Sequence, residues 1–280
     1  MYAETFALLP GGTYTLAMAL HRLQHTVVWA TDFGTDPLSR LVRDAARREG
    51  LNDDGFRHHD QPLVSVTVAL SDQTDRTMVS YQDKMPSLDL ADLVREHRPR
   101  WLAVPYLAYD RASLDALTAA HEMGAKVFMD CQDVSASLTD PAVRQALALT
   151  TAFAPNAPEA IALTGAATVA DAIDVLAQLC DTVVITQGAD GATVQRGHVR
   201  HRVPGISVAA LDTTGAGDCF NGGFLHGLLQ QQEILACATT AVACGAAATT
   251  ALGSAGALHL EDLRDWLTSG LTATTGGGAS

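Results

Sequence analysis

The sequence has few basic residues. Only 18 lysines and arginines stand against 31 aspartates and glutamates, which gives a formal net charge of −13 over 280 residues. So acidic a chain is a poor partner for nucleic acid or an anionic membrane, because both attract basic surfaces. Residues 1–20 also lack the basic stretch, apolar run and cleavage site of a secretory signal. We therefore expect a cytoplasmic protein with no nucleic-acid or membrane partner.

Cysteine is also scarce, and its spacing excludes two kinds of site. The five cysteines are scattered and never occur as Cys-x-x-Cys: they are Cys131, Cys180, Cys219, Cys237 and Cys244. This odd number without paired spacing favours reduced thiols over a disulfide framework or a zinc site. One long uncharged run covers the nineteen positions 234–252. Because it is rich in alanine and threonine rather than leucine, it predicts a buried helix of a globular fold instead of a membrane span.

What is present is a regular alternation of strand-like and helix-like segments. Short apolar runs at 101–104, 126–129 and 182–186 alternate with segments of helical periodicity at 110–123, 141–149 and 170–179. Repeated β-α-β units of this kind predict an α/β fold with a mainly parallel central sheet flanked by helices. Residues 63–70 and 76–81 alternate around a polar turn and predict a small β-hairpin, suited to a lid. Residues 194–203 predict a second hairpin.

The most informative segment is a glycine-rich turn that leads directly into a helix at 212–220. Apolar residues follow Asp218 at helical spacing, so the turn lies at a helix N-terminus. Free N–H groups and the positive end of the helix dipole make such a turn a site for anions. A carboxylate there would repel the anion, but it can take the proton from an alcohol that attacks a phosphoryl group. The plainer interpretation of Asp218, taken alone, is a helix cap.

The same segment resembles a family signature. Asp212-Thr213-Thr214-Gly215-Ala216-Gly217-Asp218-Cys219-Phe220 is similar to the D-T-x-G-A-G-D-x-F motif of the ribokinase-like (PfkB) carbohydrate kinases. The resemblance implies that Asp218 is the catalytic base and that the amides of residues 215–217 form the anion hole. It also implies a monovalent cation, K⁺, held partly by Asp212 and Thr214. The chain contains no G-x-x-x-x-G-K-[ST] loop, which excludes a P-loop kinase.

A second segment resembles the family's P-N-x-x-E motif. It reads Ala154-Pro155-Asn156-Ala157-Pro158-Glu159. The resemblance implies that Asn156 and Glu159 order Mg²⁺ and phosphate through water. Taken without the family, these two residues are better explained as a helix cap and a first-turn acid.

Two further segments complete the resemblance, which extends from about residue 5 to 267. Thr186-Gln187-Gly188-Ala189-Asp190-Gly191 resembles the T-x-G-x-x-G strand end, and Pro10-Gly11-Gly12 resembles the family's P-G-G turn. The first implies that Thr186, Gly188 and Gly191 bind ATP, together with Gly253. The second implies that the two glycines of 11–12 bind the acceptor. By themselves, both segments are only turn signals.

The resemblance implies one ribokinase-like α/β domain over residues 1–269, with lid elements near 1–12 and 63–83 and a flexible tail at 270–280. It implies an ATP-dependent phosphotransferase that moves the γ-phosphoryl group to an alcohol of a sugar or sugar-like molecule. ATP, Mg²⁺ and K⁺ would be its cofactors. A homodimer through the lid is also expected.

Two departures from the family concern the acceptor. Leu16 stands where the family carries an asparagine that contacts the sugar. Only nine residues precede Pro10, where relatives have a strand with a sugar-binding aspartate. Either the numbered chain lacks its natural start, or the acceptor site is built differently. Two alternatives therefore stay open: a nucleoside or vitamin-precursor kinase of the same superfamily, and a non-catalytic metabolite-binding relative. The intact Asp218 argues against the second.

Overall fold

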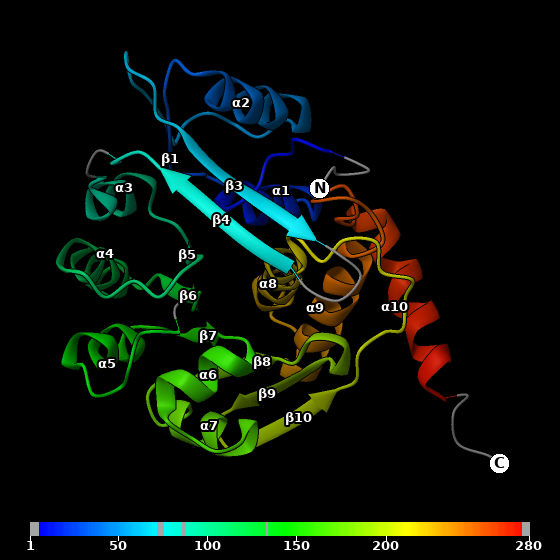
Figure 1. The fold of residues 1–280 in the computed structure, drawn as a ribbon. Coiled ribbons are helices and arrows are strands. Elements are labelled where there is room, and N and C mark those ends of the chain that lie inside the picture. The colour runs from blue at the N-terminus through cyan, green and yellow to red at the C-terminus, as the bar shows by residue number, and fades with distance from the viewer. Residues whose placement is uncertain (1–5, 72–75, 86–87, 133, 276–280) are drawn as a thin grey trace. The chain divides into compact units, whose positions relative to one another are not determined.

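The computed structural model describes residues 6–71, 76–85, 88–132 and 134–275. The chain divides into two compact units (Figure 1). The smaller unit comprises Met1–Pro10 and Thr26–Leu88, and the larger unit comprises Gly11–His25 and Asp89–Ser280. Every residue that the sequence predicts for the functional site belongs to the larger unit.

The larger unit is built on a six-stranded sheet. Its strands are β5 (Trp101–Val104), β6 (Lys126–Asp130), β7 (Ala152–Ala154), β8 (Thr182–Thr186), β9 (Ala192–Arg196) and β10 (Val199–Val203). They lie in the order β10-β9-β8-β7-β6-β5. Strands β5 to β8 are parallel, whereas β9 and β10 form the antiparallel hairpin predicted at 194–203. The predicted mainly parallel sheet is confirmed.

Helices cover both faces of this sheet (Figure 1). The larger unit contains α1 (Thr13–Arg22), α3 (Leu90–His97), α4 (Arg111–Glu122), α5 (Pro141–Ala148), α6 (Ala157–Thr164), α7 (Val169–Leu176), α8 (Ala216–Leu229), α9 (Ile234–Ala248) and α10 (Leu260–Thr275). Alternate residues of β6 divide between the two sides. Val127 and Met129 belong to the core cluster that includes α3 to α7, and Phe128 between them meets Phe224 of α8 with ring centroids 6.4 Å apart.

The uncharged run that begins at residue 234 forms α9, as predicted, and α9 packs closely on α8. A Cβ atom added at Gly223 would lie 2.8 Å from the sulfur of Cys244, and one at Gly227 would lie 2.8 Å from the sulfur of Cys237. These two glycines therefore let the helix backbones approach each other. Within the described ranges, no helix combines the length and apolar character that a membrane crossing requires.

Helix α8 also packs along α1, and the two helices run in the same direction. Thr15 lies against Gly215, whose added Cβ would be 3.0 Å from the threonine methyl, and Ala19 lies against Gly222 at 2.9 Å. At the other end of the helix pair, His25, which follows α1, and His226 in the last turn of α8 share a hydrogen bond of 2.9 Å between ring nitrogens. The N-termini of α1 and α8 consequently lie at the same end of the larger unit.

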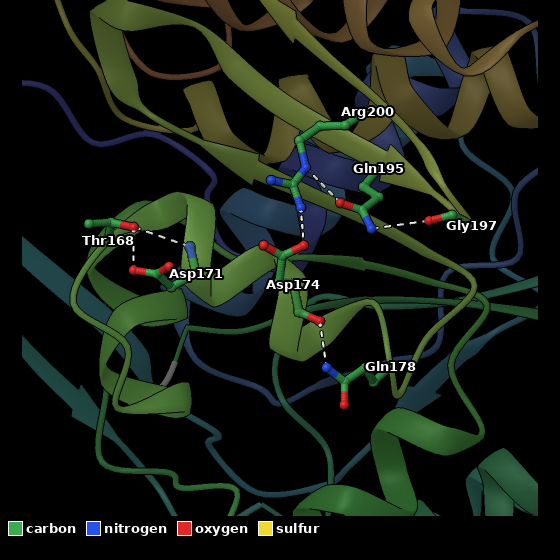
Figure 2. A network of polar contacts seen from close by, with 7 residues as sticks. All are labelled: Thr168, Asp171, Asp174, Gln178, Gln195, Gly197 and Arg200. Carbon is green, nitrogen blue, oxygen red and sulfur yellow. Dashed lines mark hydrogen bonds and ion pairs between the residues drawn. The ribbon is translucent and has the colours of Figure 1, made fainter.

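The outer edge strand of the sheet is fastened by polar contacts (Figure 2). Arg200 of β10 pairs with Asp174 of α7, and its Nε donates to Gln195 Oε1 at 2.7 Å. Gln195 in turn donates to the carbonyl of Gly197 at 3.1 Å. An edge strand held in this way and lined by charged side chains is protected from pairing with another chain.

The smaller unit contains α2 (Pro37–Glu49), a parallel pair β1 (Thr31–Phe33) and β2 (Phe56–His58), and an antiparallel pair β3 (Ser65–Ser71) and β4 (Arg76–Gln82). The hairpin predicted for the lid is β3–β4. The unit extends beyond the lid elements predicted near 1–12 and 63–83, because α2 and the β1–β2 pair share its core. Trp29, Phe33 and Phe56 pack edge to face in that core, with ring centroids 4.9–5.9 Å apart.

At the other end of the chain, residues 270–275, the first part of the predicted flexible tail, are helical. Helix α10 continues through these residues to Thr275. Residues 276–280 of the predicted tail lie outside the described part of the chain.

Asp36 joins three segments of the smaller unit. Its Oδ1 accepts from the N–H groups of Leu38 and Ser39 and so caps α2. Its Oδ2 accepts from Ser39 Oγ at 2.7 Å and from the N–H of Leu63 at 3.0 Å, which leads into the β3–β4 hairpin. Ser39 Oγ also accepts from the N–H of Gly34. Asp36 is buried, and all of these bonds except the partly buried one from Leu38 are made away from water.

Replacing Asp36 by alanine should destabilise the smaller unit by about 2–4 kcal/mol, because it leaves buried N–H groups without an acceptor. Urea unfolding followed by the fluorescence of Trp29, with Trp101 and Trp266 changed to phenylalanine, measures this. The control is Asp44→Ala on α2, whose carboxylate is exposed and makes only a 3.9 Å pair with Arg47; it should cost under about 0.5 kcal/mol. Equal effects of the two variants would contradict the role given to Asp36.

Candidate active site

The predicted anion-binding turn precedes α8 as expected. Gly215 is the N-cap residue of α8 and has a φ of 76°, in the left-handed region that glycine adopts without strain. The N–H of Ala216 makes a long bond of 3.3 Å to the carbonyl of Thr213. An added Cβ at Gly217 meets no atom within 4 Å. The turn therefore presents the positive end of α8 beside open space, which suits a phosphoryl group.

Asp218 lies in the first turn of α8, next to this open space, and is half-buried. Burial, with a smaller contribution from the charge of Asp130, raises the pKa of Asp218 to about 7. A carboxylate with a pKa near neutral is a better proton acceptor than an ordinary aspartate. Its position and basicity both suit the predicted role of general base.

Asp130 and Asn221 are two site residues that the sequence reasoning missed. Asp130 ends β6, and its Oδ2 accepts a hydrogen bond of 2.9 Å from Asn221 Nδ2 of α8. Burial and the nearby charge of Glu159 raise the pKa of Asp130 to about 6, against the lowering effect of its hydrogen bonds. The available signal was its position at the carboxyl end of a parallel strand, where sites of α/β proteins lie.

Asn156 and Glu159 form a capping box at the start of α6. Glu159 N–H donates to Asn156 Oδ1 at 2.9 Å, and Asn156 N–H donates to Glu159 Oε2 at 2.9 Å. The helix-cap interpretation is therefore correct for both residues. The two bonds do not involve Asn156 Nδ2 or Glu159 Oε1. The cap is therefore compatible with the predicted role of both residues in ordering Mg²⁺ and phosphate through water.

The structure brings this segment next to the predicted nucleotide turn. Thr186 at the end of β8 donates its N–H to the carbonyl of Pro155 at 3.1 Å and forms a parallel bridge with Asn156. The turn after Thr186 contains two glycines with positive φ, 60° at Gly188 and 91° at Gly191. An added Cβ at Gly191 would lie 2.1 Å from the carbonyl oxygen of Val203, so only glycine fits there.

The predicted cation residues also lie together. Asp212 Oδ1 accepts from the N–H of Thr214 at 2.9 Å and from its hydroxyl at 2.6 Å. Asp212 Oδ2 accepts from the N–H of Gly253 at 2.8 Å. The loop before α8 and the loop after α9 are thus tied by one carboxylate, which fixes the turn that leads to Asp218.

Gly11 and Gly12 lie at the start of α1, where Gly12 is the N-cap residue with a φ of 61°. No atom lies within 4 Å of a Cβ added at either position. Because α1 and α8 run side by side in the same direction, this open turn and the Gly215–Gly217 turn face the same end of the unit. Leu16 in the next turn of α1 is buried, 5% exposed, and offers no polar atom to an acceptor.

The donor set fits a magnesium nucleotide. Asp130 and Glu159 are buried, and neither forms an ion pair within the described residues. Carboxylate oxygens without a protein cation match the preference of Mg²⁺ for oxygen ligands and water. Two helix N-termini at the same end supply positive partial charge for phosphate.

The parallel sheet, the glycine turn before the buried helix α8 and the acid in the first turn of that helix define a class of protein. They are the features of a ribokinase-like phosphotransferase. The pfkB family carbohydrate kinase profile matches residues 1–260. Fructokinase of Escherichia coli is 30% identical over 274 residues, which cover 89% of this chain and 88% of that protein. The chain belongs to the PfkB family of carbohydrate kinases and is an ATP-dependent kinase that phosphorylates a hydroxyl group of a sugar or sugar-like molecule.

Solved structures agree on the fold. Arabidopsis thaliana ribokinase complexed with ribose and ATP has a TM-score of 0.79 at 19% identity, with 95% of this chain and 90% of that chain covered. Aminoimidazole riboside kinase from Salmonella enterica, complexed with aminoimidazole riboside and an ATP analog, has a TM-score of 0.76 at 25% identity. In that comparison 95% of each chain is covered.

Because the pKa of Asp218 is raised, its ionised form should lower the free energy of unfolding at neutral and alkaline pH. An aspartate whose pKa in the folded state lies above its unfolded value of 3.8 contributes its full stabilisation of the fold below pH 3.8. The contribution is lost as pH rises through about 7. Asp218→Asn should therefore melt at a higher temperature than the wild type at pH 8, and the difference should shrink toward pH 4. Calorimetric melting of both proteins, with the exposed Asp265→Asn as control, measures this. An advantage that is independent of pH would contradict the assignment.

Proposed function

We propose that Asp218 is the general base of the phosphoryl transfer. It takes the proton of the acceptor hydroxyl while that oxygen attacks the γ-phosphorus of ATP, and ADP leaves with the bridging oxygen. The amides of Gly215, Ala216 and Gly217 stabilise the negative charge of the transferring group at the N-terminus of α8. The observation that carries this proposal is an acid with a pKa of about 7 beside an open, positively polarised turn.

The nucleotide side is assigned to β8 and α6. Thr186, Gly188 and Gly191 would contact ATP, and Gly253 would lie on the same side. Asn156 and Glu159 would hold Mg²⁺ through water, and the ion, when bound, neutralises charge on the phosphate oxygens. The adjacency of Asn156 and Thr186 supports this assignment, because one ligand can then reach both segments.

Asp212 and Thr214 would hold K⁺. Their hydrogen bonds already tie the loop before α8 to Gly253, so a cation there would stiffen the anion-binding turn.

The acceptor is proposed to be a sugar bound at Gly11 and Gly12. The burial of Leu16 where an asparagine is expected favours a second candidate, a riboside with a heterocyclic ring. Such a molecule presents fewer hydroxyls for the protein to satisfy, and each hydroxyl left unpaired would cost about 1–3 kcal/mol. Aminoimidazole riboside kinase of Salmonella typhimurium, 39% identical over 126 residues, is in keeping with this candidate.

Asp218→Asn should lower kcat by about 10²–10⁴ while ATP binding stays nearly unchanged. A coupled ADP-release assay with fructose, ribose, aminoimidazole riboside and adenosine measures turnover and identifies the acceptor. Calorimetry with a non-hydrolysable ATP analogue checks binding, and Asp265→Asn is the matched control. Near wild-type turnover of Asp218→Asn on the best acceptor would refute the base. No turnover of the wild type with any alcohol would favour a binding protein instead.

We further propose that the protein is a homodimer through the β3–β4 hairpin. Val68 pairs with Val79 and Val66 with Tyr81, so these four side chains share one face of the hairpin. Val68, Val79 and Tyr81 are 51%, 62% and 59% exposed. Apolar side chains gathered on one face of a two-stranded sheet favour burial against a second copy, since such a hairpin is marginally stable alone.

Val79→Glu should shift the protein from dimer to monomer in sedimentation equilibrium. The control is Ser80→Glu, on the opposite face of the same strand, where Ser80 bonds to Thr67. It should leave the mass unchanged. A wild-type protein that sediments as a monomer at micromolar concentration would overturn the dimer.

A further inference from the structure

The turn between β8 and β9 is closed by its own backbone. The N–H of Gln187 donates to the carbonyl of Gly191 at 2.8 Å, and the N–H of Gly191 donates to the carbonyl of Gly188 at 3.1 Å. The N–H of Asp190 donates to the carbonyl of Gln187, also at 3.1 Å. Residues 188–190 are exposed, and exposed backbone bonds give little resistance to local opening. The shape of the turn therefore depends on what else holds it.

The side chain of Gln187 ties this turn to the sheet. Gln187 Oε1 accepts a hydrogen bond of 2.8 Å from the hydroxyl of Thr193 on β9, and the bond is partly buried. Gln187 is the first residue after β8, and Thr193 is the second residue of β9. The bond therefore spans the turn from one strand end to the other.

Thr193 lies on a face of the sheet that is otherwise apolar at this point. It pairs with Ile185 of β8, and directly paired residues of antiparallel strands share one face. Ile185 is fully buried in the core cluster that includes α3 to α7. A hydroxyl group beside such a neighbour costs free energy unless it has a polar partner. Gln187 is that partner, so the two side chains depend on each other.

The chain that follows β10 also holds the turn. A Cβ atom added at Gly191 would lie 2.1 Å from the carbonyl oxygen of Val203, and one at Gly205 would lie 2.0 Å from the carbonyl oxygen of Ala189. These contacts are between backbones, and neither glycine has room for a side chain. The bond to Thr193, by contrast, is made by side chains. It can be removed without changing the fit of the backbones.

A second glutamine on this face of β9 holds a different turn. Gln195 follows Thr193 by two residues, so the two side chains point to the same side of the sheet. Gln195 bonds to Arg200 and to the carbonyl of Gly197 in the turn between β9 and β10 (Figure 2). The bond between Thr193 and Gln187 closes the turn at the other end of β9, where the nucleotide site is proposed.

We propose that Gln187 is a positioning residue for ATP: held by the Thr193 hydroxyl, it fixes the turn that contacts the nucleotide. The inference rests on the proposed nucleotide site. Gln187 takes no part in proton or phosphoryl transfer. A turn that is already ordered loses less conformational freedom when ATP binds. The pair therefore acts on the affinity for the nucleotide and not on the chemical step.

Thr193→Val removes the hydroxyl and keeps the size of the side chain. The KM for ATP should rise about three- to ten-fold, as expected for the loss of one hydrogen bond. The kcat at saturating ATP and the KM for the acceptor should stay within about two-fold of the wild type. Thr193→Ser keeps the hydroxyl and should bind ATP as the wild type does. Calorimetry of the free protein with a non-hydrolysable ATP analogue measures the same change as a Kd.

Gln187→Met removes the acceptor instead of the donor and serves if Thr193→Val folds poorly. It should raise the Kd for the ATP analogue by a similar factor. Because the two variants remove the same bond, the double variant should raise the Kd no further than the larger single effect. Effects that multiply in the double variant would contradict the pairing of Gln187 with Thr193 as the cause.

Thr168→Val is the matched control. The Thr168 hydroxyl also donates to a side-chain oxygen, Asp171 Oδ2 at 2.7 Å, at the N-terminus of α7 (Figure 2). This variant should lower the melting temperature and leave the Kd for the ATP analogue unchanged. If Thr193→Val behaves in the same way, its role is structural and the inference is overturned.

Gly188→Ala tests the nucleotide site itself. Gly188 has a φ of 60°, so a side chain there strains the turn and should weaken binding of the ATP analogue. A raised Kd in Gly188→Ala with an unchanged Kd in Thr193→Val would overturn the inference and leave the nucleotide site in place. An unchanged Kd in both variants would refute the nucleotide site at this turn, and the inference with it.

Discussion

The close packing of α8 is the constraint on which the site depends. Glycines at 215, 222, 223 and 227 allow α1 on one side and α9 on another to approach within contact of its backbone. Phe224 meets the sheet through Phe128. A helix enclosed in this way has little freedom to tilt or slide, so its first turn holds a fixed position. The glycine turn before α8 and Asp218 are accurately positioned because the helix that supports them is closely packed, not because the turn itself is rigid.

The same enclosure creates the electrostatic character of the site. Placing Asp218 at the start of a buried helix removes water from its carboxylate, and Asp130 adds a like charge from β6. Capping residues elsewhere in the fold avoid this: Asp36 and Asp110 accept several N–H bonds each and have lowered pKa values. The chain thus uses one residue type in two ways, as a satisfied cap that stabilises a helix and as an under-compensated acid that is ready for a proton.

The sequence allowed the sheet, the second hairpin and the glycine-rich turn before α8 to be predicted, because each depends on local periodicity or on a contiguous motif. Contacts between distant residues were not accessible in this way. Asn221 and Asp130 are 91 residues apart, and neither belongs to a motif. The smaller unit is larger than the expected lid because Asp36 bonds to Leu63 and Trp29 packs on Phe56. The helical end of α10 was missed because threonine and glycine there are weak helix formers.

The five cysteines are free thiols, and all are buried. Burial raises the pKa of Cys180, Cys219 and Cys244 to about 12 and that of Cys237 to about 11, so almost none of these four thiols is present as a reactive thiolate at neutral pH. Cys219 adjoins Asp218 and is still shielded from oxidants and alkylating reagents. Modification of this protein by such reagents must therefore wait for the core to open. The rate at which these native thiols are labelled therefore measures how often the core opens, without an engineered probe residue.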